Sequence, residues 1–286
     1  MNDFEFHAPA SLDEAFALLA QYGDTARPMS GGTALVILMK QSLVNPEHLV
    51  SLEKIPGLDS IRVVGAELRI GGLARHYDVE HSAAVRDFAP LLCDIYHRVA
   101  TVKIRNMATV GGGLAHADPA QDPPPGFMTL DARVRLRSRD GEREIPVSDL
   151  FSDYYETIIQ PGEILTEVIV PRPSPSARFT YLKFLPRTED DYATVAVAAK
   201  AETGGGVCRN VRVALAAAGP TPIRATAVEQ ALEGQPATSA AVRSAAEAVA
   251  GHVDPLDDFR GSSAYKRDMA VVFTRRALER VLGLAG

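Results

Sequence analysis

The chain has 286 residues and a formal net charge of −6 at pH 7, with 46% hydrophobic and 23% charged residues. This composition is typical of a folded, soluble protein, and no segment has the roughly 20 consecutive apolar residues that would cross a bilayer. The basic residues are scattered apart from a cluster at 265–281, which argues against nucleic acid as the main ligand.

The chain contains two cysteines, Cys93 and Cys208. Two are too few for a disulfide scaffold, a four-ligand zinc site or an iron–sulfur cluster held by this chain alone. We therefore expect two free, buried thiols. The first residues have neither the basic region nor the apolar stretch of a secretory signal, which favours a cytoplasmic location.

The first elements predicted along the chain are a helix and then a β-loop-α unit. Ser11 is a good helix cap, Glu14 follows at the capping-box spacing, and Gly23 is placed to end the helix. The stretch ARPMSGGTALVILMK at 26–40 indicates a short strand, a Gly-Gly turn and an apolar helix. From residue 61 the apolar period changes to two, so IRVVGAELRIGG predicts an antiparallel hairpin around Gly65.

The middle of the chain combines a helical pattern with a segment rich in glycine and proline. A helix is predicted over 87–102, and it leads into the glycine-rich stretch at 108–119. The prolines at 123–125 have a fixed φ and are expected to stiffen the exit from that stretch. Alternating apolar residues at 133–137, followed by Asp140-Gly141, predict a second hairpin.

A Pro/Ser-rich crossing at 171–176 is the best candidate for a domain boundary. Beyond it we expect three strands between residues 180 and 219, helices at 223–234 and 238–251, and a last helix at 265–282. Both parts therefore have mixed helix and strand content, and the predicted fold class is α+β. In the last helix the predicted buried side holds Met269, Val272, Phe273 and Val281, and the outer side holds Arg275, Arg276 and Arg280.

Two glycine segments are candidate binding sites: SGGTAL at 30–35 and ATVGGGLAHADP at 108–119. Glycine lets a backbone approach a ligand closely and turn its N–H groups towards a phosphate, and Thr33 and Thr109 can add hydroxyl donors. The helix expected after Thr33 would add its positive end. Two such segments suit a diphosphate, although each Gly-Gly pair alone is equally typical of an ordinary turn. Neither matches the GxGxxG or the GxxxxGK[ST] signature.

Other groups of polar residues give weaker indications of a functional site. His76, His97 and His116 with Asp78 or Asp118 could be drawn as metal ligands, but no close ligand spacing supports this, and solvated histidines are the better interpretation. The charged run at 187–196 is interpreted as a turn before a strand.

Five motifs, taken in order, carry a resemblance to a known family: SGGTAL, IRNMATVGGGLAHADPAQD, YLKFLPRTEDDYATVAVAA, AAAGPTPIRA and YKRDMAVVFTRRAL. Together they resemble the FAD-binding medium subunit of the molybdenum hydroxylases, a family that includes xanthine dehydrogenase and carbon monoxide dehydrogenase. The resemblance implies a PCMH-type (vanillyl-alcohol-oxidase-like) FAD-binding domain at 1–174, with subdomains at about 1–55 and 56–174. A C-terminal α+β domain of the CO dehydrogenase flavoprotein type would occupy 177–286.

The resemblance also implies which residues contact FAD. The two glycine segments would cradle the diphosphate, His116 would lie near the cofactor, and Asp122 would contact its adenosine side. Leu165 and Lys183 would border the flavin ring, Tyr192 would cover it, and Arg187 and Asp191 would position the covering segment. Ala34 stands where the family commonly has an acidic residue, and Gly113 where it often has Ser or Asn. The implied cofactor-binding residues are Arg27, Pro28, Met29, Ser30, Gly31, Gly32, Thr33, Ala34, Leu35, Ala108, Thr109, Gly111, Gly112, Gly113, Ala115, His116, Asp122, Leu165, Lys183 and Tyr192.

The implied function is that of an FAD-containing oxidoreductase subunit that transfers electrons. A large subunit with molybdopterin and a small subunit with two [2Fe-2S] clusters would complete a heterotrimer, single or doubled, and NAD, a quinone or another molecule would accept the electrons. The cofactor carries the redox chemistry, so we expect no catalytic acid, base or metal ligand in this chain. Two alternatives stay open: a stand-alone FAD oxidoreductase using His97, His116 or Tyr192, and a flavin-free scaffold of the same fold.

Overall fold

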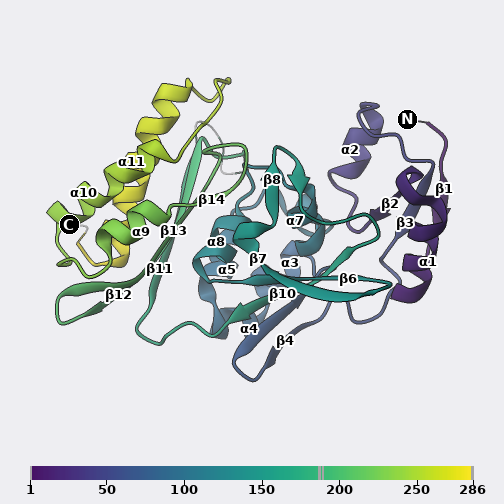
Figure 1. Ribbon diagram of the computed structural model, residues 1–286, viewed down its shortest axis with the longest axis horizontal. Helices are drawn as coiled ribbons and strands as arrows, with labels where there is room; N and C mark the ends of the chain where they lie inside the picture. Colours follow the sequence, from purple (N-terminus) through teal and green to yellow (C-terminus); the bar gives the residue numbers. More distant parts are fainter. Residues whose placement is uncertain (1, 186–187, 189, 285–286) are drawn as a thin grey trace.

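The computed structural model describes residues 2–185, 188 and 190–284, and the molecule is elongated, with its two ends far apart (Figure 1). The strands are β1 (Glu5–His7), β2 (Ala26–Met29), β3 (His48–Ser51), β4 (Ile61–Val64), β5 (Glu67–Gly71), β6 (Arg133–Ser138), β7 (Gly141–Pro146), β8 (Phe151–Asp153), β9 (Glu156–Thr157), β10 (Ile164–Pro171), β11 (Arg178–Phe184), β12 (Val195–Gly204), β13 (Val207–Ala216) and β14 (Ile223–Arg224). The helices are α1 (Leu12–Tyr22), α2 (Leu35–Lys40), α3 (His76–His81), α4 (Ala83–Phe88), α5 (Pro90–His97), α6 (Val102–Arg105), α7 (Val110–His116), α8 (Pro123–Thr129), α9 (Thr226–Leu232), α10 (Ser239–Glu247) and α11 (Ser263–Val281). The predicted α+β class is confirmed.

The first sheet is parallel, with strand order β1-β3-β2, and α1 packs against it. Ser11 caps α1 by accepting a hydrogen bond from the Glu14 N–H, and Gly23 ends the helix at φ +50°. The strand β2 runs into the Gly-Gly turn and then α2, so the predicted β-loop-α unit is confirmed.

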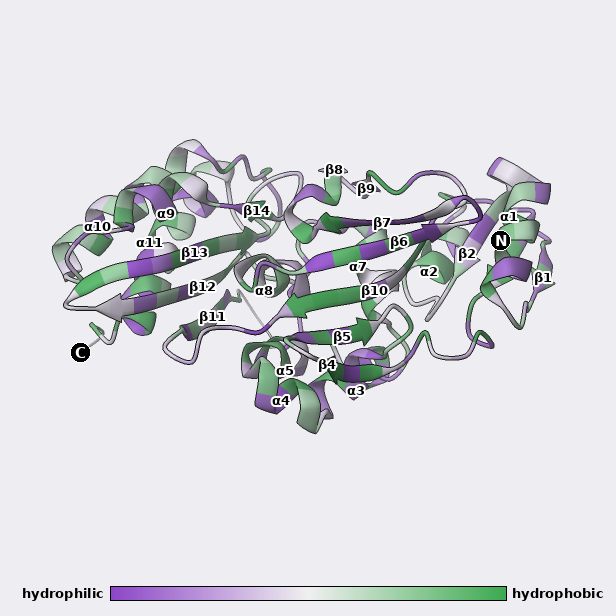
Figure 2. Ribbon diagram, turned by 60° about the horizontal axis from the view of Figure 1, so that its bottom comes forward, coloured by the Kyte–Doolittle hydropathy of each residue, from purple (hydrophilic) through white to green (hydrophobic). Residues whose placement is uncertain are grey.

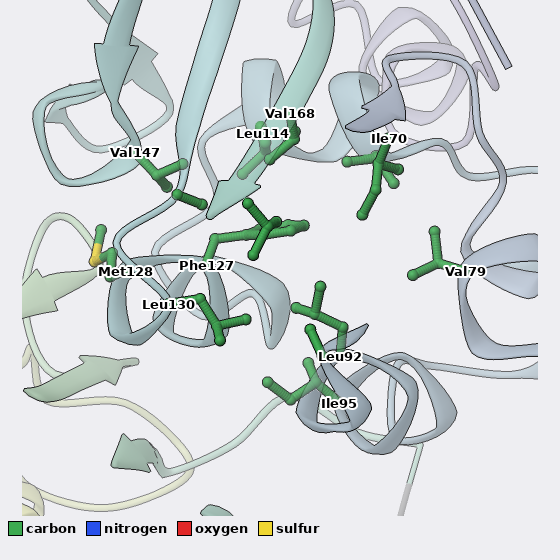
Figure 3. Packing of buried hydrophobic residues seen from close by; sticks show 14 of the residues in the cluster. Ile70, Val79, Leu92, Ile95, Leu114, Phe127, Met128, Leu130, Val147 and Val168 are labelled. Atoms are coloured by element: carbon green, nitrogen blue, oxygen red, sulfur yellow. The ribbon is translucent and has the colours of Figure 1, made fainter. Parts of the chain in front are cut away.

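The second sheet is antiparallel, with order β4-β5-β10-β6-β7, and both predicted hairpins are present in it. Figure 2 shows the strongly apolar β10 in the middle of this sheet, between β5 and β6. Even Glu167 on β10 is buried, and it is neutralised by Arg62 at 2.7 Å and by Arg135 at 3.1 Å. Helices α5, α7 and α8 cover the sheet through a core centred on Phe127 (Figure 3).

One prediction about this region is wrong. The helix expected over 87–102 is interrupted, because Pro90 starts a new helix, α5, which ends at His97. The prolines at 123–125, which are predicted to stiffen the exit from the glycine-rich stretch, form the buried first turn of α8. Proline is tolerated there because the N–H groups of a first helical turn have no partner within the helix.

The third sheet has order β11-β12-β13-β14, and its two faces pack against different helices. On one face Val195, Val197 and Leu215 share a core with α9, α10 and α11. On the other face Ala198 and Ala214 belong to the core centred on Phe127, and their small side chains let α8 lie close to β12 and β13. The core therefore continues across the Pro/Ser-rich crossing.

The buried side of α11 differs from the predicted one. Its buried residues are Lys266, Ala270, Thr274, Ala277, Leu278 and Val281. Small residues face the sheet because the helix lies close to it, whereas Met269, Val272 and Phe273 lie at the margin and are only half-buried. Arg276 and Arg280 are exposed as predicted, and Arg275 is half-buried. Among the described helices, none combines the length and apolarity needed to cross a membrane.

Candidate functional site

The two glycine segments, 79 residues apart in sequence, meet through their hydroxyl side chains. Thr109 Oγ1 donates to Ser30 Oγ at 2.9 Å and accepts from the Gly112 N–H at 3.2 Å. Because Ser30 Oγ is the acceptor in this chain of hydrogen bonds, its own proton stays available for a further acceptor.

The first segment is a half-buried turn that leaves several donors free. Within the part of the chain that the structure describes, none of the backbone N–H groups of residues 30–34 donates a hydrogen bond to the protein. Gly32 has φ +69°, and a Cβ on Gly31 would lie only 1.9 Å from Met107 O, so glycine is needed both for the turn and for its packing. Free N–H donors beside the Ser30 hydroxyl suit an anionic group such as a diphosphate.

The second segment is a helix terminus rather than the turn that its Gly-Gly pairs suggest. Thr109 caps α7, and Gly111 and Gly112 lie in its first turn. Their lack of a side chain permits close packing: a Cβ on Gly111 would lie 2.8 Å from Gly72 O, and a Cβ on Gly112 would lie 2.5 Å from Ser30 Oγ. Glycine has a low helix propensity, so these close tertiary contacts explain why Gly111 and Gly112 occur in a helix.

Three residues that support this segment were missed as site residues. Gly72, at the end of β5, accepts from the Gly111 N–H and donates to Thr166 O, both at 2.8 Å, which places Leu165 and its strand beside α7. Gln121 Nε2 donates to Gly113 O at 2.8 Å. His76 Nε2 lies 3.2 Å from Thr109 O. For Gly72 the signal in the sequence is the Gly71-Gly72 pair, which is typical of a close backbone approach.

His76 is neutral and fixes the start of α7. Burial lowers the pKa of His76 to about 4, so near neutral pH the ring carries one proton. Because Thr109 O is an acceptor, that proton belongs on Nε2, and His76 donates to it. His76 Nδ1 is buried and has no hydrogen-bond partner among the described residues.

A second cluster joins Asp122 and Lys183. Lys183 Nζ donates to Asp122 Oδ2 at 3.0 Å and to Arg98 O at 2.9 Å, and the Tyr181 hydroxyl donates to Asp122 Oδ1. The Lys183 side chain is only 1% exposed and that of Asp122 6%. The resemblance implies that Asp122 contacts the adenosine side of the cofactor and that Lys183 borders the flavin ring; in the structure the two side chains form one buried ion pair.

A third cluster surrounds Tyr192, which is 44% exposed. Burial and the nearby Asp118 carboxylate raise the pKa of Tyr192. The ring of Tyr155 lies 5.3 Å from that of His116, and the Tyr155 hydroxyl donates to Asp118 at 3.5 Å. The predicted covering segment is therefore flanked by Tyr155, an aromatic side chain outside the motifs that carry the family resemblance.

Arg260, which is distant in sequence, contacts the covering segment at Asp191 and Tyr192. Its guanidinium lies 3.5 Å from Asp191 and 5.7 Å from the centre of the Tyr192 ring. Asp191 was predicted to position the segment, and this contact is consistent with that role. The other residue predicted for this role, Arg187, lies outside the described residues.

The remaining predicted residues lie in or next to the two glycine segments. The Arg27 side chain turns back to the carbonyls of Asp24 and Ala26, at 3.4 and 3.2 Å. Ala34 precedes α2 without a side-chain cap, and α2 itself has only six residues. Pro28 and Ala115 are exposed, Ala108 is buried, and Met29, Thr33 and Leu35 are half-buried.

The histidines considered as metal ligands do not form a common site in the described part of the chain, and the two cysteines are not paired. His97 pairs with Glu80 at 2.8 Å, His76 is buried, and His116 lies beside Tyr155. Both cysteines are free; Cys208 is buried as expected and Cys93 half-buried. Burial raises the pKa of both thiols, which makes them poor nucleophiles.

Two family models match consecutive parts of the chain. The one described as "FAD binding domain in molybdopterin dehydrogenase" matches residues 2–173. The one described as "CO dehydrogenase flavoprotein C-terminal domain" matches residues 180–281.

The chain is also similar to curated proteins along almost its whole length. It is 34% identical to the carbon monoxide dehydrogenase medium chain of Hydrogenophaga pseudoflava, with 96% of each chain covered. It is 29% identical to the glyceraldehyde dehydrogenase medium chain of Sulfolobus acidocaldarius, with 98% of each covered.

Solved structures of such proteins superimpose closely on this chain. A carbon monoxide dehydrogenase from Hydrogenophaga pseudoflava matches with a TM-score of 0.96 and 35% identity, covering 100% of this chain and 99% of that one. Quinoline 2-oxidoreductase from Pseudomonas putida 86 matches with a TM-score of 0.92 and 30% identity, covering 99% and 98%.

Proposed function

The chain belongs to the family of FAD-binding medium subunits of the molybdenum hydroxylases, and on that basis we propose that it is the electron-transfer subunit of a molybdopterin-containing complex. The partners we propose are a large molybdopterin subunit and a small [2Fe-2S] subunit, with NAD, a quinone or another molecule as external acceptor. Relatives named for carbon monoxide and for glyceraldehyde have similar medium chains, which favours substrate selection by another subunit.

The contact between Ser30 and Thr109 carries this proposal. It joins the first segment, which carries the free N–H groups of 30–34 and the Ser30 hydroxyl, to the start of α7, and this set of donors suits a diphosphate. We propose that Gly31, Gly112 and Gly113 allow this approach. When bound, FAD would supply the redox chemistry that links iron–sulfur clusters to acceptors of one or two electrons.

We place the flavin ring near the Asp122–Lys183 pair and Tyr192. The Asp122 carboxylate contributes to the raised pKa of Tyr192, so the second and third clusters are electrostatic neighbours. In this arrangement Lys183 holds a positive charge at the ring, Leu165 borders it on the side of β10, and Tyr192 shields it from solvent. Asp122 then belongs to the ring end of the site rather than to the adenosine end.

The first experiment is an absorbance spectrum of the chain co-expressed with its genomic neighbours, with the copurifying subunits identified by mass. Flavin and iron–sulfur absorbance together with a large and a small partner would support the three-subunit complex. Flavin without partners would instead favour a stand-alone oxidoreductase, and a colourless chain that cannot be reconstituted would favour a scaffold.

The second experiment tests the diphosphate site directly. Ser30→Ala removes one donor to FAD and also the acceptor of the Thr109 hydroxyl. We therefore expect FAD affinity to fall by about 10- to 100-fold and the thermal midpoint of the flavin-free chain to fall slightly. The affinity is measured by titrating flavin-free protein with FAD. Ser152→Ala, at an exposed serine on β8, is the control. Equal affinities of the two variants would show that Ser30 does not contact FAD.

A further inference from the structure

Three side chains that commonly bind metals gather on the first sheet. Glu5 and His7 lie on β1, and His48 lies on β3. The parallel register pairs Glu5 with His48, and His7 follows Glu5 by two residues, so all three side chains lie on one face of the sheet. His48 also pairs with Ala26 at the beginning of β2, whereas Ser30 follows the end of that strand, so the group is separate from the glycine segments.

The spacing of the three ligand atoms suits a tetrahedral metal ion. His7 Nε2 lies 3.1 Å from His48 Nδ1, and Glu5 Oε2 lies 3.4 Å from His48 Nδ1 and 3.9 Å from His7 Nε2. Zinc binds nitrogen and oxygen ligands at about 2.0–2.2 Å, so neighbouring ligand atoms in a tetrahedral site are about 3.3–3.5 Å apart. The three observed distances bracket this value, and small side-chain movements would equalise them.

Packing orders the two imidazoles before any ion binds. The Tyr22 ring stacks on His48 with centroids 3.6 Å apart and on His7 at 5.1 Å. The two histidine side chains are 13% and 16% exposed, whereas Glu5 is 64% exposed. A pair of fixed nitrogen ligands with a mobile carboxylate on the solvent side leaves room for water as a fourth ligand.

We propose that Glu5, His7 and His48 bind one divalent transition-metal ion, with zinc as the best match, and that the ion ties the edge strand β1 to β3. Two imidazoles and a carboxylate favour zinc and its neighbours over magnesium or calcium, which prefer all-oxygen sites. The strand β1 has only three residues, so a metal bridge would add substantially to its attachment. The competing explanation is a hydrogen bond between two neutral imidazoles.

The test uses the untagged full-length chain, stripped with a chelator and titrated with zinc in a calorimeter at neutral pH. We expect one saturable equivalent in the wild type. His7→Gln and His48→Gln should each weaken binding by more than about tenfold because a ligand is lost, and Glu5→Gln should weaken it less. His97→Gln is the matched control, since His97 also pairs with a carboxylate but belongs to no three-ligand group among the described residues.

A second measurement guards against loss of folding in the variants. Zinc should raise the thermal midpoint of the wild type and of His97→Gln, but not that of His7→Gln. Glu5 is exposed, so Glu5→Gln should keep the fold and reports on affinity alone. Equal zinc affinity in wild type and in both histidine variants, or no saturable binding in the wild type, would overturn the proposal and leave the imidazole hydrogen bond as the explanation.

Discussion

His76 is a buried side chain whose charge state affects stability. Its pKa is lowered by burial to about 4, whereas an unfolded histidine titrates near 6.5. Between these values the unfolded chain binds a proton that the folded chain does not, so the free energy of unfolding falls as pH decreases through this window. The full difference corresponds to roughly 3 kcal/mol.

We therefore predict that His76→Gln flattens the dependence of stability on pH. Glutamine keeps an N–H donor for Thr109 O but does not titrate, so the loss of stability between about pH 6.5 and about pH 4 should shrink by up to roughly 3 kcal/mol. Urea unfolding at several pH values measures this. His81→Gln, at a half-exposed histidine, is the control. An unchanged slope in His76→Gln would assign the effect to other groups.

Tyr192 gives a second prediction for a single residue, which rests on the proposed position of the flavin ring. Tyr192→Ala opens the exposed side of the third cluster, so we expect rates with artificial electron acceptors to change several-fold while FAD affinity changes little. Tyr192→Phe keeps the ring and should resemble the wild type. Stopped-flow reoxidation with acceptors of different size measures this, and unchanged rates with every acceptor would argue against a covering role.

At the scale of elements, Gly72 is the position where β5, β10 and α7 come closest. A Cβ there would lie 2.3 Å from Leu165 O, a backbone atom that cannot move without shifting β10. We predict that Gly72→Ala destabilises the chain by more than about 2 kcal/mol. Gly251→Ala, where a Cβ would meet nothing within 4 Å, is the control. Chemical denaturation of both variants makes the comparison, and similar stabilities would contradict the packing explanation.

The elements that could be predicted from the sequence are those whose signals are local. The two hairpins and α1 depend on turn and cap residues adjacent to them, and all three are present. In contrast, α7 and α8 contain glycines and prolines that disfavour helix in isolation. They form because close contacts with Gly72, Ser30 and the core around Phe127 compensate for low propensity.

The same distinction holds for the candidate site. Ser30 and Thr109 lie in motifs that family resemblance makes visible, and the structure brings them together. Tyr155 and Arg260 carry no local signal, because their partners Asp118 and Asp191 lie 37 and 69 residues away in the chain. Whether Tyr155 and Arg260 reach the candidate site depends on how the second and third sheets pack.

At the scale of the whole molecule, the core around Phe127 extends across the proposed domain boundary at 174–177. Ala198 and Ala214, beyond the boundary, lie in the same core as Phe127. Asp131, which follows α8, pairs with Lys200, Arg212 and Arg224 at 3.1, 2.9 and 3.3 Å. Apolar and ionic contacts thus couple the two parts along the interface between α8 and the third sheet.

From this coupling we predict that the flavin-free chain unfolds in one transition, with equal calorimetric and van't Hoff enthalpies. Ala214→Leu adds a bulky side chain to the interface with α8, where overpacking costs about 1–3 kcal/mol, and it should separate the transition into two. A leucine in place of Ala237, which packs at the margin of the core on the other face of the third sheet, serves as the control and should leave a single transition. Two transitions already present in the wild type would show that the shared core does not couple the parts, and that the boundary near residue 174 separates independent folding units.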